Sequence, residues 1–180
     1  MQNVILDIAK NAIKDGFSHT DTLDKKALLE LYPEFAKPKA TFVTLTLDRQ
    51  LRGCIGSLIA HRPLLDDLIY NAKAAAFDDP RFYPLNPEEF SRIHIEVSLL
   101  SEPELITYEN SDDLKSKVTV GEDGIILQKG SRKATFLPQV WEQLPTFELF
   151  FSHLCQKAGL ESECLESHPD IWRYKVQKVK

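Results

Sequence analysis

The chain has 180 residues, of which 43% are hydrophobic and 27% are charged, and its formal net charge is −5. These values are typical of a globular chain with one sizeable core, so we predict a single domain over residues 1–180. The acidic balance provides no overall basic field, so nucleic acid is not an expected partner. The N-terminus has no basic region followed by a long apolar run, and no later segment reaches transmembrane length. We therefore expect a cytoplasmic protein without membrane contact.

The cysteine pattern argues against covalent or metal cross-links. The three cysteines, Cys54, Cys155 and Cys164, form an odd set without a CxxC pair. We therefore expect neither a disulfide framework nor a zinc or iron–sulfur site held by this chain, and we predict no metal and no resident cofactor. Cys155 lies on the apolar stripe of a predicted helix, where a core position is expected, whereas Cys164 falls in a polar loop.

The first half of the chain alternates between helical and strand periodicity. Capping residues, glycines and prolines separate the segments. In chain order we predict helices before residue 16 and over 24–31 within an N-terminal region of about 1–38, a hairpin of strands 41–47 and 51–57, a helix over 65–76, a capped helical turn at 86–89 and a strand over 93–99.

The second half repeats the order of hairpin, helix and strand. The predicted elements are a hairpin of 124–127 with 134–137, a helix over 147–158 and a strand over 172–176. The same order therefore occurs over about 41–100 and again over about 120–179. We predict an α+β fold in which two hairpin-helix-strand units share an antiparallel sheet.

The most informative segment is the LRGCIGS sequence at residues 51–57. On an extended strand Arg52, Cys54 and Gly56 share one face. A guanidinium beside a thiol favours the thiolate, and the glycine leaves space near the sulfur for a ligand or another backbone. A buried structural cysteine between glycines that mark a bulge is the alternative interpretation.

Six short motifs together resemble a known family. They are Leu51–Ser57, Asp79–Phe82, Ile95–Ser101, Gly124, Leu137–Val140 and Leu154–Leu160. In this order they are similar to the motifs of the AMMECR domain family, whose bacterial members are called AmmeMemoRadiSam system protein A. The resemblance implies an α+β domain of two unequal lobes with a cleft between them. It also implies, from genome context, a Memo-like protein and a radical SAM protein as partners, but it supplies no established reaction.

Several motif residues have both a structural and a functional interpretation. Asp79 and Arg81 leave a helix in a rigid turn, where they either present an ion pair at a cleft or tie down the loop. Glu96 lies either on a solvated sheet face or, as the resemblance implies, in the same cleft as Cys54 and near enough to act as its base. The Gln139 amide either orients a ligand or satisfies loop backbone groups.

Two classes of function follow from these residues. In an enzyme, Cys54 would be the nucleophile or covalent carrier, Arg52 would lower the thiol pKa or bind an anionic substrate, and Glu96 would move protons. In a module that binds a peptide, a nucleotide or a partner protein, the contact surface would include Gly53, Gly56, Asp79, Arg81 and Gln139. Because no histidine is linked by motif to Cys54, we favour a substrate-carrying or adaptor component of a radical SAM- and Memo-linked modification system.

Overall fold

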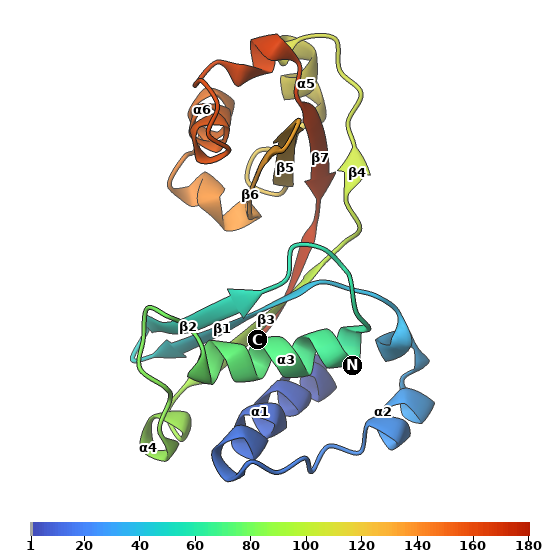
Figure 1. The fold of residues 1–180 in the computed structure, drawn as a ribbon, viewed down its shortest axis with the longest axis vertical. Coiled ribbons are helices and arrows are strands. Elements are labelled where there is room, and N and C mark those ends of the chain that lie inside the picture. The colour runs from blue at the N-terminus through green and yellow to red at the C-terminus, as the bar shows by residue number, and fades with distance from the viewer. Residues whose placement is uncertain (1) are drawn as a thin grey trace. The chain divides into compact units, whose positions relative to one another are not determined.

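A computed structural model describes residues 2–180, which divide into two compact units. The first unit extends to Leu100 and includes Gln177–Lys180, and the second unit is Ser101–Val176. Figure 1 labels their helices and strands. None of the helices in residues 2–180 is long and apolar enough to span a membrane.

The first unit is a four-stranded sheet with helices on one face. Its elements are α1 (Gln2–Ser18), α2 (Lys25–Leu31), the 3-10 helix η1 (Pro33–Ala36), β1 (Thr41–Leu47), β2 (Gln50–Gly56), α3 (Leu64–Phe77), α4 (Pro87–Phe90), β3 (His94–Leu100) and β8 (Val176–Val179). The strand order is β2-β1-β3-β8, and β1 is antiparallel to both β2 and β3. Helices α1 and α3 pack on each other and cover one face of the sheet (Figure 1).

Alternation along the strands explains this arrangement. Val43, Leu45 and Val97 are fully buried in the core beneath α1 and α3. Thr44 and Glu96, which project from the opposite face, are only half-buried. The strand face without helices therefore carries partly exposed polar side chains.

Helix α3 approaches β2 unusually closely at Gly53. A Cβ atom on Gly53 would lie 2.1 Å from the carbonyl oxygen of Ala75 in α3. Real Cβ atoms essentially never come within 3.0 Å of such an atom, so only glycine allows this backbone contact. The glycine is therefore required by the packing of the helix on the sheet.

A buried polar cluster also joins α3 to the sheet. The Asp67 carboxylate accepts hydrogen bonds from the backbone N–H and the hydroxyl of Thr41, both at 2.8 Å, and from the hydroxyl of Ser57 at 2.7 Å. The Asn71 amide donates to the same carboxylate and to the Thr41 carbonyl. Because each partner is satisfied inside the protein, the cluster fixes the position of the helix relative to β1.

The second unit has its own four-stranded sheet. Its elements are β4 (Glu104–Leu105), α5 (Ser111–Lys117), β5 (Gly124–Lys129), β6 (Arg132–Phe136), the 3-10 helix η2 (Pro138–Glu142), α6 (Phe147–Lys157), the 3-10 helix η3 (Cys164–Ser167) and β7 (Asp170–Tyr174). The strand order is β4-β7-β5-β6. Phe150 of α6 is fully buried in this core and stacks on Trp141 with 3.6 Å between ring centroids.

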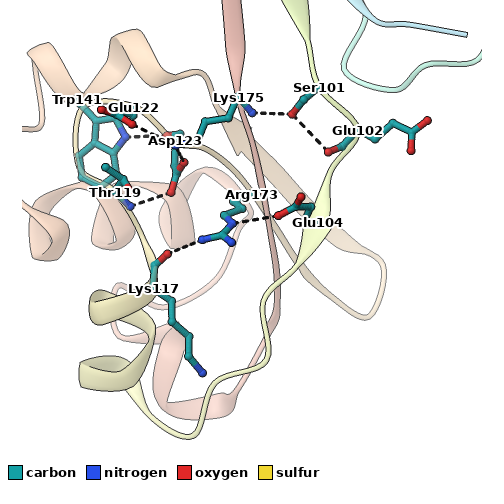
Figure 2. Close-up of polar contacts among 10 residues, drawn as sticks. All are labelled: Ser101, Glu102, Glu104, Lys117, Thr119, Glu122, Asp123, Trp141, Arg173 and Lys175. Atoms are coloured by element: carbon teal, nitrogen blue, oxygen red, sulfur yellow. Dashed lines mark hydrogen bonds and ion pairs between the residues drawn. The ribbon is translucent and has the colours of Figure 1, made fainter.

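Polar contacts tie the first and last segments of the second unit together, as Figure 2 shows. The backbone N–H of Lys175 donates to the Ser101 hydroxyl at 2.8 Å, and the N–H of Ser101 donates to the Lys175 carbonyl at 2.9 Å. The Lys175 ammonium lies 2.6 Å from the buried carboxylate of Asp123, whose other oxygen accepts from the Thr119 N–H. The segments at which the chain enters and leaves this unit are thus fixed to it.

The α+β class and the order of elements are confirmed, but the sheet organisation differs from the prediction. Instead of one shared sheet, each unit has a separate four-stranded sheet. The β5-β6 hairpin pairs with β7, and β7 pairs with β4. Each hairpin therefore pairs with strands of its own unit. This pairing joins residues far apart in the sequence, and strand periodicity does not specify it.

The expectation of no disulfide is wrong, because Cys155 and Cys164 are bonded to each other. Helix α6 ends near Lys157, and Gly159 then adopts a left-handed conformation with a φ of 75°. This turn reverses the chain and brings the two Cα atoms to 5.8 Å across a sequence separation of 9 residues. The pair escaped prediction because its spacing matches no short cysteine motif.

The contact at Gly53 generates a stability prediction. We expect Gly53→Ala to lower the free energy of unfolding by about 1–3 kcal/mol, because the backbone of α3 must move to admit the methyl group. Gly56→Ala is the matched control, since its methyl group meets the half-buried Phe42 ring rather than backbone, and it should cost less. Chemical denaturation of both variants measures the difference, and equal losses would contradict the prediction.

Candidate functional site

The site is built around the backbone of Cys54, on a strand at the edge of the first sheet. Cys54 pairs with Thr44 of β1, and β2 has no strand on its other side. The N–H of Cys54 donates to the Asp79 carboxylate at 2.9 Å, and its carbonyl accepts from the Arg81 guanidinium at 3.3 Å. Both backbone groups point away from β1, so Asp79 and Arg81 occupy the place of a neighbouring strand.

Asp79 and Arg81 form a bidentate ion pair in which the carboxylate side chain is buried and the arginine side chain is exposed. Arg81 Nε lies 3.0 Å from Oδ1 and Nη2 lies 2.8 Å from Oδ2 of Asp79. The Asp79 side chain is 2% exposed, whereas that of Arg81 is 54% exposed. The hydrogen bonds from Arg81, assisted by the Cys54 N–H, outweigh the effect of burial and hold the pKa of Asp79 well below its usual range. The carboxylate is therefore ionised at neutral pH.

Arg52 is bound to the carboxylate of Glu89 and not to that of Asp79, which contacts Cys54. Leu45 of β1 pairs with Gly53, but the next residue of β1, Thr46, pairs with Leu51. Arg52 is therefore skipped in the strand pairing and lies in a bulge. Its Nε and Nη2 donate to the two oxygens of Glu89 at 2.9 and 2.8 Å. This bidentate contact is the main cause that lowers the pKa of Glu89.

A surface pocket of about 380 Å³ lies between these two ion pairs. It is lined by Arg52, Arg81, Phe82, Tyr83, Pro84, Asn86 and Glu89. The Phe82 ring lies near both guanidinium groups, with its centroid 5.8 Å from the Arg52 carbon and 5.4 Å from the Arg81 carbon. Both distances allow cation–π attraction. Cys54 is not among the lining residues.

The Cys54 thiol is free and half-buried. Within residues 2–180, the polar side chain that contacts its sulfur is that of Thr44, with 3.3 Å between the hydroxyl oxygen and Sγ. No hydrogen bond joins the sulfur to a histidine, an arginine side chain or a carboxylate in the described part of the chain. The arrangement therefore contains a thiol without an oriented base.

Glu96 lies on the same sheet but faces a different set of charges. It pairs with Thr44, which places it two strands from Cys54, roughly 10 Å away by strand spacing. Its carboxylate contacts Lys180 at 2.9 Å and Lys178 at 3.3 Å. Burial acts to raise the pKa of Glu96, but the two ammonium groups outweigh it and the pKa is lowered. The geometry does not support proton transfer from Cys54 to this carboxylate.

The remaining predicted binding residues have separate surroundings. Gly53 faces Ala75 of α3, as described above. The expected free space beside Gly56 is occupied, because a Cβ there would lie 2.2 Å from the Phe42 ring. Gln139 is exposed in η2 of the second unit.

Sequence reasoning missed the pocket residues Tyr83 and Glu89. The Asn86–Glu89 capping box was recognisable, and it is present with both reciprocal hydrogen bonds. The second role of Glu89, as the partner of Arg52, depends on a contact across 37 positions. No local pattern specifies such a contact.

Comparison with known proteins identifies the family. The AMMECR1 family model matches residues 6–179. The chain belongs to the AMMECR1 family. A relative from Methanothermobacter thermautotrophicus is 36% identical over 179 residues, which cover 96% of this chain and 90% of that protein. A relative from Methanocaldococcus jannaschii is 39% identical over 163 residues, with 86% and 76% coverage.

A solved structure with a similar fold supports the architecture. The crystal structure of an uncharacterised protein, PH0010, from Pyrococcus horikoshii matches with a TM-score of 0.82 and 32% sequence identity. The match covers 97% of this chain and 88% of that protein. The α+β fold described here is therefore shared with that protein.

The lowered pKa of Asp79 predicts a specific pH dependence of stability. Since the fold favours the ionised carboxylate, its contribution is complete above the ordinary pKa of 3.8 and is lost as the pH falls below it. We expect Asp79→Asn to lower the free energy of unfolding at pH 7 by about 2 kcal/mol, because the charge that accepts hydrogen bonds from Arg81 and from the Cys54 N–H is lost. When both proteins are denatured at pH values from 7 to 2.5, the difference in free energy of unfolding between the native protein and Asp79→Asn should decrease as the pH falls.

Asp78→Asn is the matched control for this prediction. Asp78 is the exposed neighbour of Asp79 at the end of α3. Its variant should have nearly unchanged stability. If the native protein and Asp79→Asn differed by the same free energy of unfolding at every pH, the role assigned to the Asp79 charge would be contradicted.

The cysteines should differ in their reaction with iodoacetamide. Without reductant, only Cys54 is expected to be alkylated, because Cys155 and Cys164 are joined in a disulfide. After unfolding and reduction all three should react. Mass-spectrometric peptide mapping before and after reduction provides the test, and early labelling of Cys155 would contradict the disulfide.

Proposed function

We propose that this AMMECR1 chain is a binding component, a substrate carrier or adaptor, of a radical SAM- and Memo-linked modification system in the cytoplasm. Its contact surface is the pocket of the first unit between Arg52 and Arg81. The observation that carries the proposal is that Arg52 and Glu96, the side chains predicted to assist the Cys54 thiol, are bound to other partners, while a surface pocket lies beside the cysteine strand.

The contacts around Cys54 bear on whether its thiol is a catalytic nucleophile. A cysteine nucleophile needs a group that takes its proton or stabilises the thiolate. Arg52 is held by Glu89, and Glu96 is held by two lysines. The backbone of Cys54, in contrast, is bound on both sides by Asp79 and Arg81. These contacts support a role for this residue in shaping the edge of the sheet.

The exposed residues of the pocket bear on whether it is a contact surface. Tyr83 is 90% exposed, and the side chain of Arg81, which lines the same pocket, is about half exposed. Tyrosine and arginine are the residue types that most often dominate the energy of protein interfaces, because each combines apolar area with polar contacts. A large exposed tyrosine in the same pocket as two oriented arginines therefore favours a contact surface for a partner.

The partners follow from the family. The AMMECR family resemblance associates this chain with a Memo-like protein and a radical SAM protein, and the proposal requires a direct contact with one of them. The second candidate function is an enzyme that uses Cys54 as nucleophile, which is favoured by the free, half-buried thiol next to Thr44.

Binding and product formation separate the two functions. If the pocket is the contact surface, Tyr83→Ala should weaken binding to the partner about tenfold or more, since an exposed anchor side chain is lost. Tyr70→Ala is the matched control, because Tyr70 is an exposed tyrosine of the same unit on α3 outside the pocket. Calorimetry with the purified Memo-like and radical SAM proteins gives the dissociation constants.

Cys54→Ser tests the alternative. The adaptor proposal predicts that this variant binds the partner and supports product formation by the complete system at an unchanged rate. Loss of product with intact binding would establish covalent use of the sulfur. Unchanged binding by Tyr83→Ala would exclude this pocket as the contact surface.

A further inference from the structure

The two pocket arginines are each oriented by a carboxylate on one side only. Glu89 binds Nε and Nη2 of Arg52, and Asp79 binds Nε and Nη2 of Arg81. Nη2 of Arg52 also donates to the Tyr83 carbonyl. Among the described residues, neither Nη1 group has a hydrogen-bond partner. Each guanidinium is thus fixed in orientation while one NH₂ group remains available.

Both arginines line the same pocket, and both guanidinium groups lie near the same aromatic ring. Their central carbons lie 5.8 and 5.4 Å from the centroid of Phe82. Arg52 is mostly removed from solvent, with a side chain that is 12% exposed. Hydrogen bonds from a desolvated guanidinium are stronger than those in open solvent. The pocket therefore provides two prepositioned cationic donors on different elements.

The charge balance indicates which anion fits. The positive charges of Arg52 and Arg81 are matched by the negative charges of Glu89 and Asp79, so these four side chains have no net charge. A ligand with one negative charge spread over two oxygens suits two single NH₂ donors, whereas a dianionic phosphate would leave twice as much uncompensated negative charge. A carboxylate meets this requirement.

Two aromatic side chains also line the pocket. Phe82 and the exposed Tyr83 both line the volume of about 380 Å³, which exceeds what a carboxylate alone would fill. An aromatic ring in the ligand would stack on these side chains at offset or edge-to-face geometry. We propose that the pocket binds an aromatic carboxylate, with the Nη1 groups of Arg52 and Arg81 donating to its oxygens. This assignment rests on the proposed function, because it names the group that the substrate or partner presents to the contact surface.

Benzoate is the probe that tests the assignment without any partner protein. Titration of the isotope-labelled full chain should give saturable chemical-shift changes in the side chains of Arg52, Arg81 and Tyr83. Acetate, which has no ring, should bind at least about threefold more weakly, and inorganic phosphate should not displace benzoate at equal concentration. Tighter binding of acetate or phosphate than of benzoate would overturn the assignment.

Two variants and one control complete the experiment. Arg52→Lys should weaken benzoate binding about tenfold, because lysine keeps the charge but loses the oriented NH₂ group. Tyr83→Ala should weaken it about threefold and, being at an exposed position, should leave the fold intact. Arg92→Lys is the control, since Arg92 is an exposed arginine of the same unit paired with Asp48 outside the pocket.

The outcomes separate this inference from the proposed function. Absence of saturable benzoate binding, or equal binding by native protein and both pocket variants, would overturn the anion assignment. If Tyr83→Ala still weakens binding to the partner in that case, the contact surface stands and only its ligand class is wrong. If benzoate binds as expected but the partner does not depend on Tyr83, the adaptor surface fails and the anion site stands.

Discussion

The contact between Gly53 and the Ala75 carbonyl is the constraint on which the site depends. Because Gly53 has no side chain, α3 lies directly against the edge strand of its sheet. The helix then ends at Phe77, and the next turn places Asp79 beside the Cys54 N–H. A bulkier residue at position 53 would move the helix and, with it, the carboxylate that holds the strand edge. The sheet packing and the site therefore share one cause.

The DPRF motif and the GC dipeptide form one physical unit, although 25 positions separate Cys54 from Asp79. An edge strand exposes backbone donors and acceptors that could pair with another chain. Here a buried aspartate and a half-exposed arginine satisfy these groups at Cys54. The cysteine thus contributes its backbone to the architecture, and its thiol is left facing Thr44. Structural use of the backbone and chemical use of the sulfur are separate properties of the same residue.

Local periodicity was sufficient to predict α1, α2, α3, α6, the two hairpins and the capping box at Asn86, because these depend on near neighbours in sequence. Helix α5 was not predicted. Local periodicity was insufficient at Arg52, where a bulge interrupts the alternation that would have placed its guanidinium beside Cys54. It also missed Lys178 and Lys180, which neutralise Glu96, and the disulfide that follows the turn at Gly159. Each of these features depends on a long-range contact or on a glycine conformation that composition does not reveal.

The charge pattern of the pocket limits how it can recognise a ligand. A mostly buried arginine without a partner would be strongly destabilising, so Glu89 is needed to keep Arg52 in place. The same carboxylate cancels the charge that would attract an anion from a distance, and the whole chain has a net charge of −5. Steering by a long-range field therefore contributes little. Recognition at this pocket must depend on the fixed directions of the two guanidinium groups and on contact with the aromatic rings.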